Sequence, residues 1–376
     1  MKLGELRMQW KLIGILSIIF PIVSACVGQQ NSQPLIPQSL SDDSPEMLEG
    51  RIAYITSDNQ IWVMDGDGEN KQLLVDDDFY KRDIAWAPNR SKLAYIARRR
   101  NDEVFFESLW VIDADGQNHH QLTDEARYAG FGWRSNSHEI GYTEFRTFEQ
   151  FPGDAHYFDI NTVTGTMTET LNSTTSPFPP VSIARHSPDK TKVAYVPQDS
   201  NSLYIANLDG TEIRELASGD AGGLTCLEWS SNGTQLAFCP PQEDQKGQST
   251  DLFTINIDGS NLRRLTNEAE QHEVSNISNI SWSPDDRWIA FILSHTGVTN
   301  QLCLIESQSE DQICFGSYWI GSESPLWSPD STRIAIVTDK VEPNTKKRIY
   351  TFSITGDIVS LTDDSQDVII GEVDWH

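Results

Sequence analysis

The stretch WSPDDRWIAF (residues 282–291) decides the fold, because nearly the same ten residues occur five more times along the chain. Each copy starts with an aromatic residue and a polar run with Asp or Asn, then ends with an aliphatic residue, Ala or Gly, and a large apolar residue. The other copies are WAPNRSKLAY (86–95), WRSNSHEIGY (133–142), HSPDKTKVAY (186–195), WSSNGTQLAF (229–238) and WSPDSTRIAI (327–336). They recur at intervals of 43 to 53 residues. Such a period indicates a repeat architecture.

The repeated phrase is predicted to be the end of one strand, a tight turn and the start of the next strand. Pro presets φ at the first central turn position, and Asp or Asn accepts backbone hydrogen bonds. The Trp offers a large flat surface to the neighbouring unit. We therefore interpret Asp189, Asp285 and Asp330 as structural turn residues without a chemical role.

Each phrase belongs to a longer unit of four short strands, named A to D here, with the phrase at the A–B turn. A variable loop and an apolar strand such as SLWVID (108–113) follow, and then an Asp-Gly turn and a short strand, as in IDGSNLRRLT (257–266). Four-stranded units at this period are typical of a β-propeller.

The two ends of the repeat region complete each other. Residues 368–376 read as a strand A with nothing after it, and residues 51–75 read as strands B, C and D with no strand A before them. We therefore predict an all-β, seven-bladed propeller of four-stranded antiparallel blades over residues 49–376, closed by a C-terminal innermost strand that pairs with the N-terminal blade.

The phrase WSPD, the strand IAF or VAY, and the ending DG-x-N-x-RRLT resemble the repeats of TolB-like propellers, a WD-like class, over about residues 50–376. That resemblance implies a binding scaffold. TolB itself has an N-terminal α/β domain and six blades, whereas a short tether and seven blades are expected here. Its partnership with an outer-membrane lipoprotein is therefore not transferred.

Residues 1–25 are predicted to be a signal peptide, since basic residues precede an apolar run (12–23) and the small pair Ser24-Ala25. The sequence VSAC (23–26) resembles the bacterial lipobox, which implies cleavage before Cys26 and diacylation of its sulfur. Two or three acyl chains anchor a protein stably to a lipid bilayer. The alternative is an ordinary secretory signal with an incidental cysteine.

Residues 26–48 are rich in Gln, Ser and Pro and are predicted to be a disordered tether. The protein is thus expected to be exported and held on the outside of the cell membrane, or facing the periplasm. A formal charge of −27 favours solubility and excludes nucleic acid as a partner, because that binding needs clustered Lys and Arg. We predict a monomer.

Four further cysteines flank two short turns. Cys226 and Cys239 lie on either side of one phrase, and Cys303 and Cys314 lie across another turn. Facing positions on adjacent antiparallel strands are close enough for a disulfide. We therefore predict the disulfides Cys226–Cys239 and Cys303–Cys314; the alternative is four buried thiols in a reduced protein.

Motifs for catalysis or metal binding are absent from the sequence: no G-x-S-x-G, H-E-x-x-H or C-x-x-C occurs. DGDGEN (65–70) lacks the Gly at the sixth position and the terminal Glu of a calcium loop, and it is interpreted as an Asp-Gly turn. The histidines, His186 among them, share no common position, and His186 stands where the other phrases have Trp. We expect no metal site, no cofactor and no catalytic residue.

The variable B–C loops are the expected recognition surface, because function concentrates in loops on a rigid scaffold. Two neighbouring blades contribute Arg and Phe, which are enriched at binding hot spots. The candidate residues are Arg98, Arg99, Arg100, Phe105, Phe106, Phe145, Arg146, Phe148 and Phe151. Alternatively, these phenylalanines pack down and hold their own loops.

The sequence therefore favours a non-catalytic binding or scaffolding module of the cell envelope, whose partner is a protein or an extracellular glycan. The alternative is a carbohydrate-active enzyme on the same scaffold. A lyase acting on polysaccharides or oligouronides is the expected kind, because some TolB-like propellers are pectate-degrading lyases.

Overall fold

The chain divides into two compact units, Met1–Pro45 and Glu46–His376. The computed structural model describes residues 50–99, 106–125, 127–145, 155–172, 178–179, 181–200, 202–218, 224–244, 247–267, 275–295, 300–309, 311–315, 324–338, 346–363, 365 and 367–376. The predicted signal peptide, the tether and Cys26 lie outside these residues. Within the described ranges there is no helix long and apolar enough to cross a membrane.

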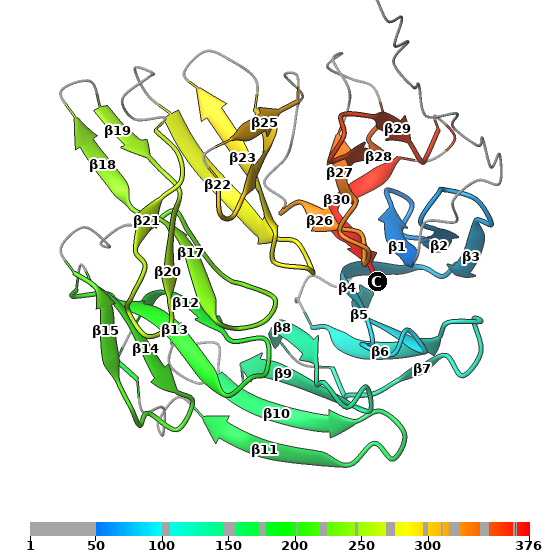
Figure 1. Ribbon diagram of the computed structural model, residues 1–376. Helices are drawn as coiled ribbons and strands as arrows, with labels where there is room; N and C mark the ends of the chain where they lie inside the picture. Colours follow the sequence, from blue (N-terminus) through cyan, green and yellow to red (C-terminus); the bar gives the residue numbers. More distant parts are fainter. Residues whose placement is uncertain are drawn as a thin grey trace, which may run out of the picture. The chain divides into compact units, whose positions relative to one another are not determined.

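The described strands form seven four-stranded antiparallel sheets, which follow one another as blades around a ring (Figure 1). Blade 2 contains β4 (Phe79–Trp86), β5 (Lys92–Arg99), β6 (Ser108–Asp113) and β7 (His120–Gln121). Blade 3 contains β8 (Arg127–Trp133), β9 (Glu139–Phe145), β10 (Ala155–Asn161) and β11 (Met167–Asn172). Blade 4 contains β12 (Val181–His186), β13 (Lys192–Pro197), β14 (Leu203–Asn207) and β15 (Arg214–Ala217).

Blade 5 contains β16 (Cys226–Trp229), β17 (Gln235–Cys239), β20 (Phe253–Asn256) and β21 (Arg263–Arg264). Its B–C loop carries an extra hairpin of β18 (Pro241–Asp244) and β19 (Gly247–Thr250). Blade 6 contains β22 (Ser275–Trp282), β23 (Trp288–His295), β24 (Gln301–Glu306) and β25 (Gln312–Cys314). Blade 7 contains β26 (Leu326–Trp327), β27 (Arg333–Thr338), β28 (Arg348–Ser353) and β29 (Ile358–Ser360).

Blade 1 closes the ring with strands from both ends of the repeat region. Its order is β30 (Val368–Trp375), β1 (Arg51–Thr56), β2 (Ile61–Asp65) and β3 (Gln72–Val75). Ile52 pairs with Trp375, and the backbone amide of Arg51 donates to the carbonyl of His376 over 2.8 Å. The predicted seven-bladed fold and its closure are confirmed.

The phrase owes its recurrence to the hydrogen bonds of the A–B turn. In blade 6 the hydroxyl of Ser283 donates to Asp285 Oδ1 over 2.6 Å and accepts the amide of Trp288 over 2.9 Å. The next residue, Asp286, has a φ of 60°, the left-handed region in which short polar residues are tolerated. Ser187 with Asp189, and Ser328 with Asp330, make the same Ser–Asp bond. These aspartates are turn residues, as expected.

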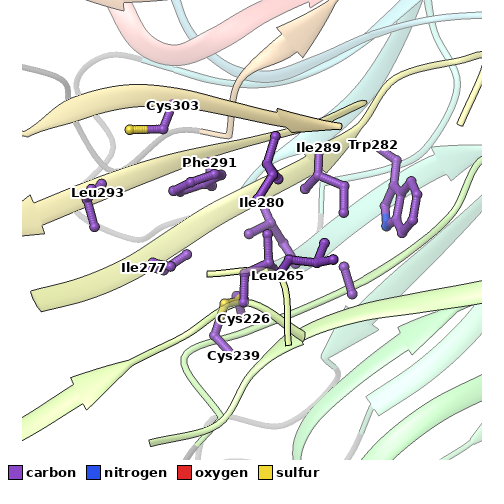
Figure 2. Packing of buried hydrophobic residues seen from close by; sticks show 13 residues of the cluster. Cys226, Cys239, Leu265, Ile277, Ile280, Trp282, Ile289, Phe291, Leu293 and Cys303 are labelled. Carbon is purple, nitrogen blue, oxygen red and sulfur yellow. A yellow bond between two sulfur atoms is a disulfide. The ribbon is translucent and has the colours of Figure 1, made fainter. Parts of the chain in front are cut away.

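The core is divided among the interfaces between consecutive blades, which we call seams and number by their blades. Six seams contain a cluster of buried apolar residues from both blades. Figure 2 shows the 5/6 cluster, where Trp282 and Phe291 of blade 6 pack with Cys226 and Leu265 of blade 5. Among the described residues no such cluster joins blades 3 and 4; blade 4 has a small cluster of its own around Tyr195.

Both disulfides expected from the sequence are present. Cys226 and Cys239 face each other in register, with 5.1 Å between their Cα atoms, and both are buried. Cys303 and Cys314 also face each other, with 4.1 Å between their Cα atoms. Each disulfide therefore links neighbouring strands within one blade.

Candidate functional site

The predicted recognition surface on the B–C loops falls largely outside the described residues. Arg100, Phe105, Arg146, Phe148 and Phe151 lie there, and only the backbone of Arg99 and Phe145 is described. Phe106 is half-buried and lies just before strand C (β6). Whether these residues bind a partner stays a prediction.

Arg98 is the best-placed residue of that surface. Its guanidinium lies 4.6 Å from the ring centroid of Tyr80, the residue directly opposite it on β4. A cation over an aromatic face is attracted by the ring quadrupole. Arg98 is therefore held against its own blade, at the rim where the B–C loop leaves the sheet.

A buried lysine ties two connections together on the same face. Lys81 is fully buried, and its ammonium donates to Asp77 Oδ1 over 2.5 Å and to the carbonyl of Asn59 over 2.8 Å. Asn59 belongs to the B–C loop of blade 1, and Asp77 to the connection between blades 1 and 2. Because a buried ammonium needs such partners, this contact fixes the described connections on the scaffold.

The opposite face carries an open depression of about 400 Å³ at the A–B turn ends of the inner strands of blades 4 to 7. We call it the mouth depression. Trp229, Trp282 and Pro188 line it, together with Leu326 and neighbouring serines. Its walls are turns and strand ends of a closed ring, so the depression is largely preformed.

Glu228 is the charged residue in the lining. Its carboxylate lies 3.7 Å from the Arg185 guanidinium, and Oε1 accepts the backbone amide of Trp229 over 3.3 Å. Burial raises the pKa of Glu228, and the positive charge of Arg185 opposes that shift. A half-buried carboxylate in an open depression can accept hydrogen bonds from a ligand hydroxyl, amide or cation.

The sequence analysis missed Glu228 because nothing in the phrase marks it. It occupies the position before the phrase's first residue, where the other blades have Ala85, Gly132, Arg185, Ser281, Leu326 and Asp374. A position that holds seven different residues in seven blades carries no repeat signal.

Within the described part of the chain, no group of three or more His, Cys, Asp or Glu side chains is arranged to hold a metal ion. His119 hydrogen-bonds the hydroxyl of Tyr95 over 2.5 Å, and His156 contacts Glu169 over 2.7 Å. His186 ends β12 in blade 4. These three histidines therefore lie in different blades or strands and do not converge.

Known proteins share this architecture. The chain is 26% identical over 113 residues to an uncharacterized peptidase, YuxL, of Bacillus subtilis (strain 168), a match to 30% of this chain and 17% of that protein. A solved prolyl endopeptidase is similar with a TM-score of 0.61 and 14% identity, over 85% of this chain and 49% of that one. An oligogalacturonate lyase in complex with manganese is similar with a TM-score of 0.54 and 13% identity, over 82% of each chain. At these identities the two solved structures support the fold alone.

The family model described as the TolB beta propeller domain matches residues 90–366, which is most of the ring. The matched range includes five of the six repeated phrases in full and five complete blades of the structure. This chain belongs to the TolB β-propeller domain family.

Proposed function

We propose that this chain is a non-catalytic binding module of the cell envelope, which seats a protein or a glycan in the mouth depression. The observation that carries the proposal is the depression of about 400 Å³ with the carboxylate of Glu228 in its lining. Ligand sites of this kind are concave, mostly apolar and equipped with few polar groups. The indoles of Trp229 and Trp282 are buried in their seams and form the floor of the depression, and the carboxylate of Glu228 would orient the donor groups of either ligand.

We also propose that lipidated Cys26 anchors the module outside a membrane through the tether of residues 26–48. The lipobox-like VSAC sequence and the tether's composition support this anchor. The variant Cys26→Ser is expected to move the protein from the membrane pellet to the soluble fraction after cell lysis. Equal sedimentation of both forms would argue against lipid anchoring.

The binding proposal is tested by cross-linking in intact cells and by a glycan array, each with wild type and Glu228→Gln. That variant keeps the side-chain shape and removes the charge, and we expect about tenfold weaker capture, because hydrogen bonds to charged groups are worth about 1.5–3 kcal/mol. Glu69→Gln, on an exposed turn of blade 1, is the matched control. Equal capture by wild type, Glu228→Gln and Glu69→Gln would show that the ligand does not bind in the mouth depression.

Arg98→Ala separates the two faces in the same assay. Loss of capture in Arg98→Ala with normal capture in Glu228→Gln would place the ligand on the B–C loops, as the sequence predicts. A different outcome would overturn the non-catalytic proposal: manganese-dependent β-elimination of oligouronides by the purified protein would make it a lyase.

A further inference from the structure

The 3/4 seam lacks the tryptophan that other seams use. Trp133, Trp229 and Trp327 each donate an indole N–H to a backbone carbonyl of the preceding blade, over 3.0, 2.9 and 3.1 Å. Each accepting carbonyl belongs to the residue just before the phrase of the preceding blade. In blade 4 the tryptophan position holds His186, which is exposed, and strand β12 contains no fully buried residue. The indole that would cover β8 is therefore missing.

The 3/4 seam also has a lysine in place of a hydrogen-bond acceptor. In three other seams, the left-handed residue of one A–B turn accepts a backbone amide from the turn before it. Asn89 donates to Ser137 over 3.0 Å, Asp285 to Ser331 over 3.1 Å, and Ser231 to Asp286 over 2.6 Å. The corresponding residue of blade 4 is Lys190, with a φ of 57°. An ammonium cannot accept a hydrogen bond, so this link between turns cannot form.

His186 and Lys190 belong to the A–B turn of blade 4 and Arg134 to that of blade 3, and the charges of these three side chains influence one another across the seam. Although His186 reaches solvent, partial desolvation by the surrounding protein atoms lowers its pKa, and the charges of Lys190 and then Arg134 lower it further. Burial likewise lowers the pKa of Lys190, with Arg134 as a second cause and Glu228 acting against it. Arg134 donates through Nε to Asp159 over 2.7 Å. Arg134 is thereby ion-paired with Asp159, so an anion at this place would meet the charges of Lys190 and of protonated His186 beside this pair.

Open space lies beside these cations. Trp133 packs toward blade 2, so its neighbour Gly132 faces blade 4, because side chains alternate along a strand. A Cβ atom at Gly132 or at Gly130 would find no heavy atom of the described residues within 4 Å. The seam therefore has room for a small group next to Arg134, His186 and Lys190.

We propose that the rim of the 3/4 seam is a binding site for a small oxyanion, a carboxylate or phosphate group held by Arg134, His186 and Lys190. The anion would occupy the space left by the absent indole and offset the positive charges of Lys190 and protonated His186. Charge-assisted hydrogen bonds to oxyanions are about twice as strong as neutral ones. The site adjoins the mouth depression, since Pro188 of the same turn lines that depression and Glu228 acts on Lys190; the two proposals are told apart by their variants, Lys190→Ser for the anion and Glu228→Gln for the ligand of the depression.

The probes are inorganic phosphate and succinate, with sodium chloride at equal ionic strength as the reference. Nuclear magnetic resonance follows the His186 ring, whose signal is assigned by its absence from His186→Trp. We expect saturable shifts and a rise of about one unit in the pKa of His186 with a probe, since a nearby anion favours the charged imidazole. A response to phosphate alone or to succinate alone supports the site and defines its anion.

Lys190→Ser is the test variant, because Ser137 and Ser331 already occupy this left-handed position in two other blades. We expect its affinity for the probe to fall about tenfold, as the loss of one charged hydrogen bond implies. Arg287→Gln, which removes an exposed cation from the blade 6 turn, should bind as wild type does. Equal responses of both variants and of wild type, or a wild-type response to chloride as large as to the probes, would overturn the proposal.

Discussion

The 5/6 and 3/4 seams are built from the same repeat and differ in almost every contact. The 5/6 seam buries a shared apolar cluster around Trp282 and the Cys226–Cys239 disulfide (Figure 2). In its turns, Asp286 accepts backbone amides from the preceding turn. The 3/4 seam has His186 and Lys190 at the positions of Trp282 and Asp286. In a repeat protein each unit depends mainly on its nearest neighbours. Because a closed ring gives every blade two neighbours, one weak seam can persist while the six other seams keep the ring closed.

The largest effect is expected from replacing Trp282 of the 5/6 seam with histidine, the residue that the 3/4 seam has at the corresponding position. Trp282→His should lower the free energy of unfolding by about 3–5 kcal/mol, because it empties most of a buried indole site. Trp282→Phe should cost clearly less, since the indole N–H of Trp282 has no partner among the described residues. Urea denaturation of the three proteins measures both values. Equal losses for His and Phe would mean that ring area is not what holds this seam.

The next effect concerns the two disulfides. Replacing Cys226 and Cys239 with Ala should cost about 3 kcal/mol, because the cross-link closes a chain segment with a separation of 13 residues and both sulfurs are buried in the 5/6 seam. Replacing Cys303 and Cys314 should cost less, since Cys314 is exposed. Thermal unfolding of the two double variants gives the order. The reverse order would indicate that the 5/6 cluster repacks without its disulfide.

The sequence predicted the ring because its signals are local and repeated. The turn phrase, the terminal half-blades and the facing cysteines each depend on residues close in sequence or on a sixfold recurrence. His186 was recognised as an exception to the phrase, but its consequence was not, because the alternation that points it at β8 must be combined with the identity of the neighbouring blade. Glu228 and Arg185 come from adjacent blades at a position without a consensus, so their pairing requires the three-dimensional structure.

A smaller effect is expected from placing an indole side chain in the 3/4 seam. His186→Trp should raise the free energy of unfolding by about 1–2 kcal/mol, since an indole would bury apolar area against β8 and its N–H could reach the carbonyl of Gly132. Because the pKa of His186 is lowered in the folded state, the unfolded chain takes up this proton first below about pH 6.5. The stability that neutral His186 contributes is thus present above that pH and is lost on acidification.

The His186→Trp variant should lack that part of the pH dependence. Urea denaturation at pH 5 and pH 7.5 measures both effects, and the gain from the indole should be larger at pH 5. Destabilisation at both pH values would show that blades 3 and 4 are too close at this point for a tryptophan. The inference that the 3/4 seam has open space beside His186 would then be wrong.

The smallest effects are expected at the left-handed residues of two A–B turns, Asp286 in blade 6 and Lys190 in blade 4. Asp286→Ala should cost about 1–2 kcal/mol, because the amide of Ser231 loses its charged acceptor. Lys190→Ser should instead stabilise by about 0.5–1 kcal/mol, because a hydroxyl at this position can accept the amide of Asn136, as Ser137 accepts that of Asn89. Amide hydrogen exchange at Ser231 and Asn136 measures each bond directly: protection should fall at the first residue and rise at the second. If Lys190→Ser left the exchange of Asn136 unchanged, the distance between the two turns, and not the missing acceptor, would be what keeps the 3/4 seam apart.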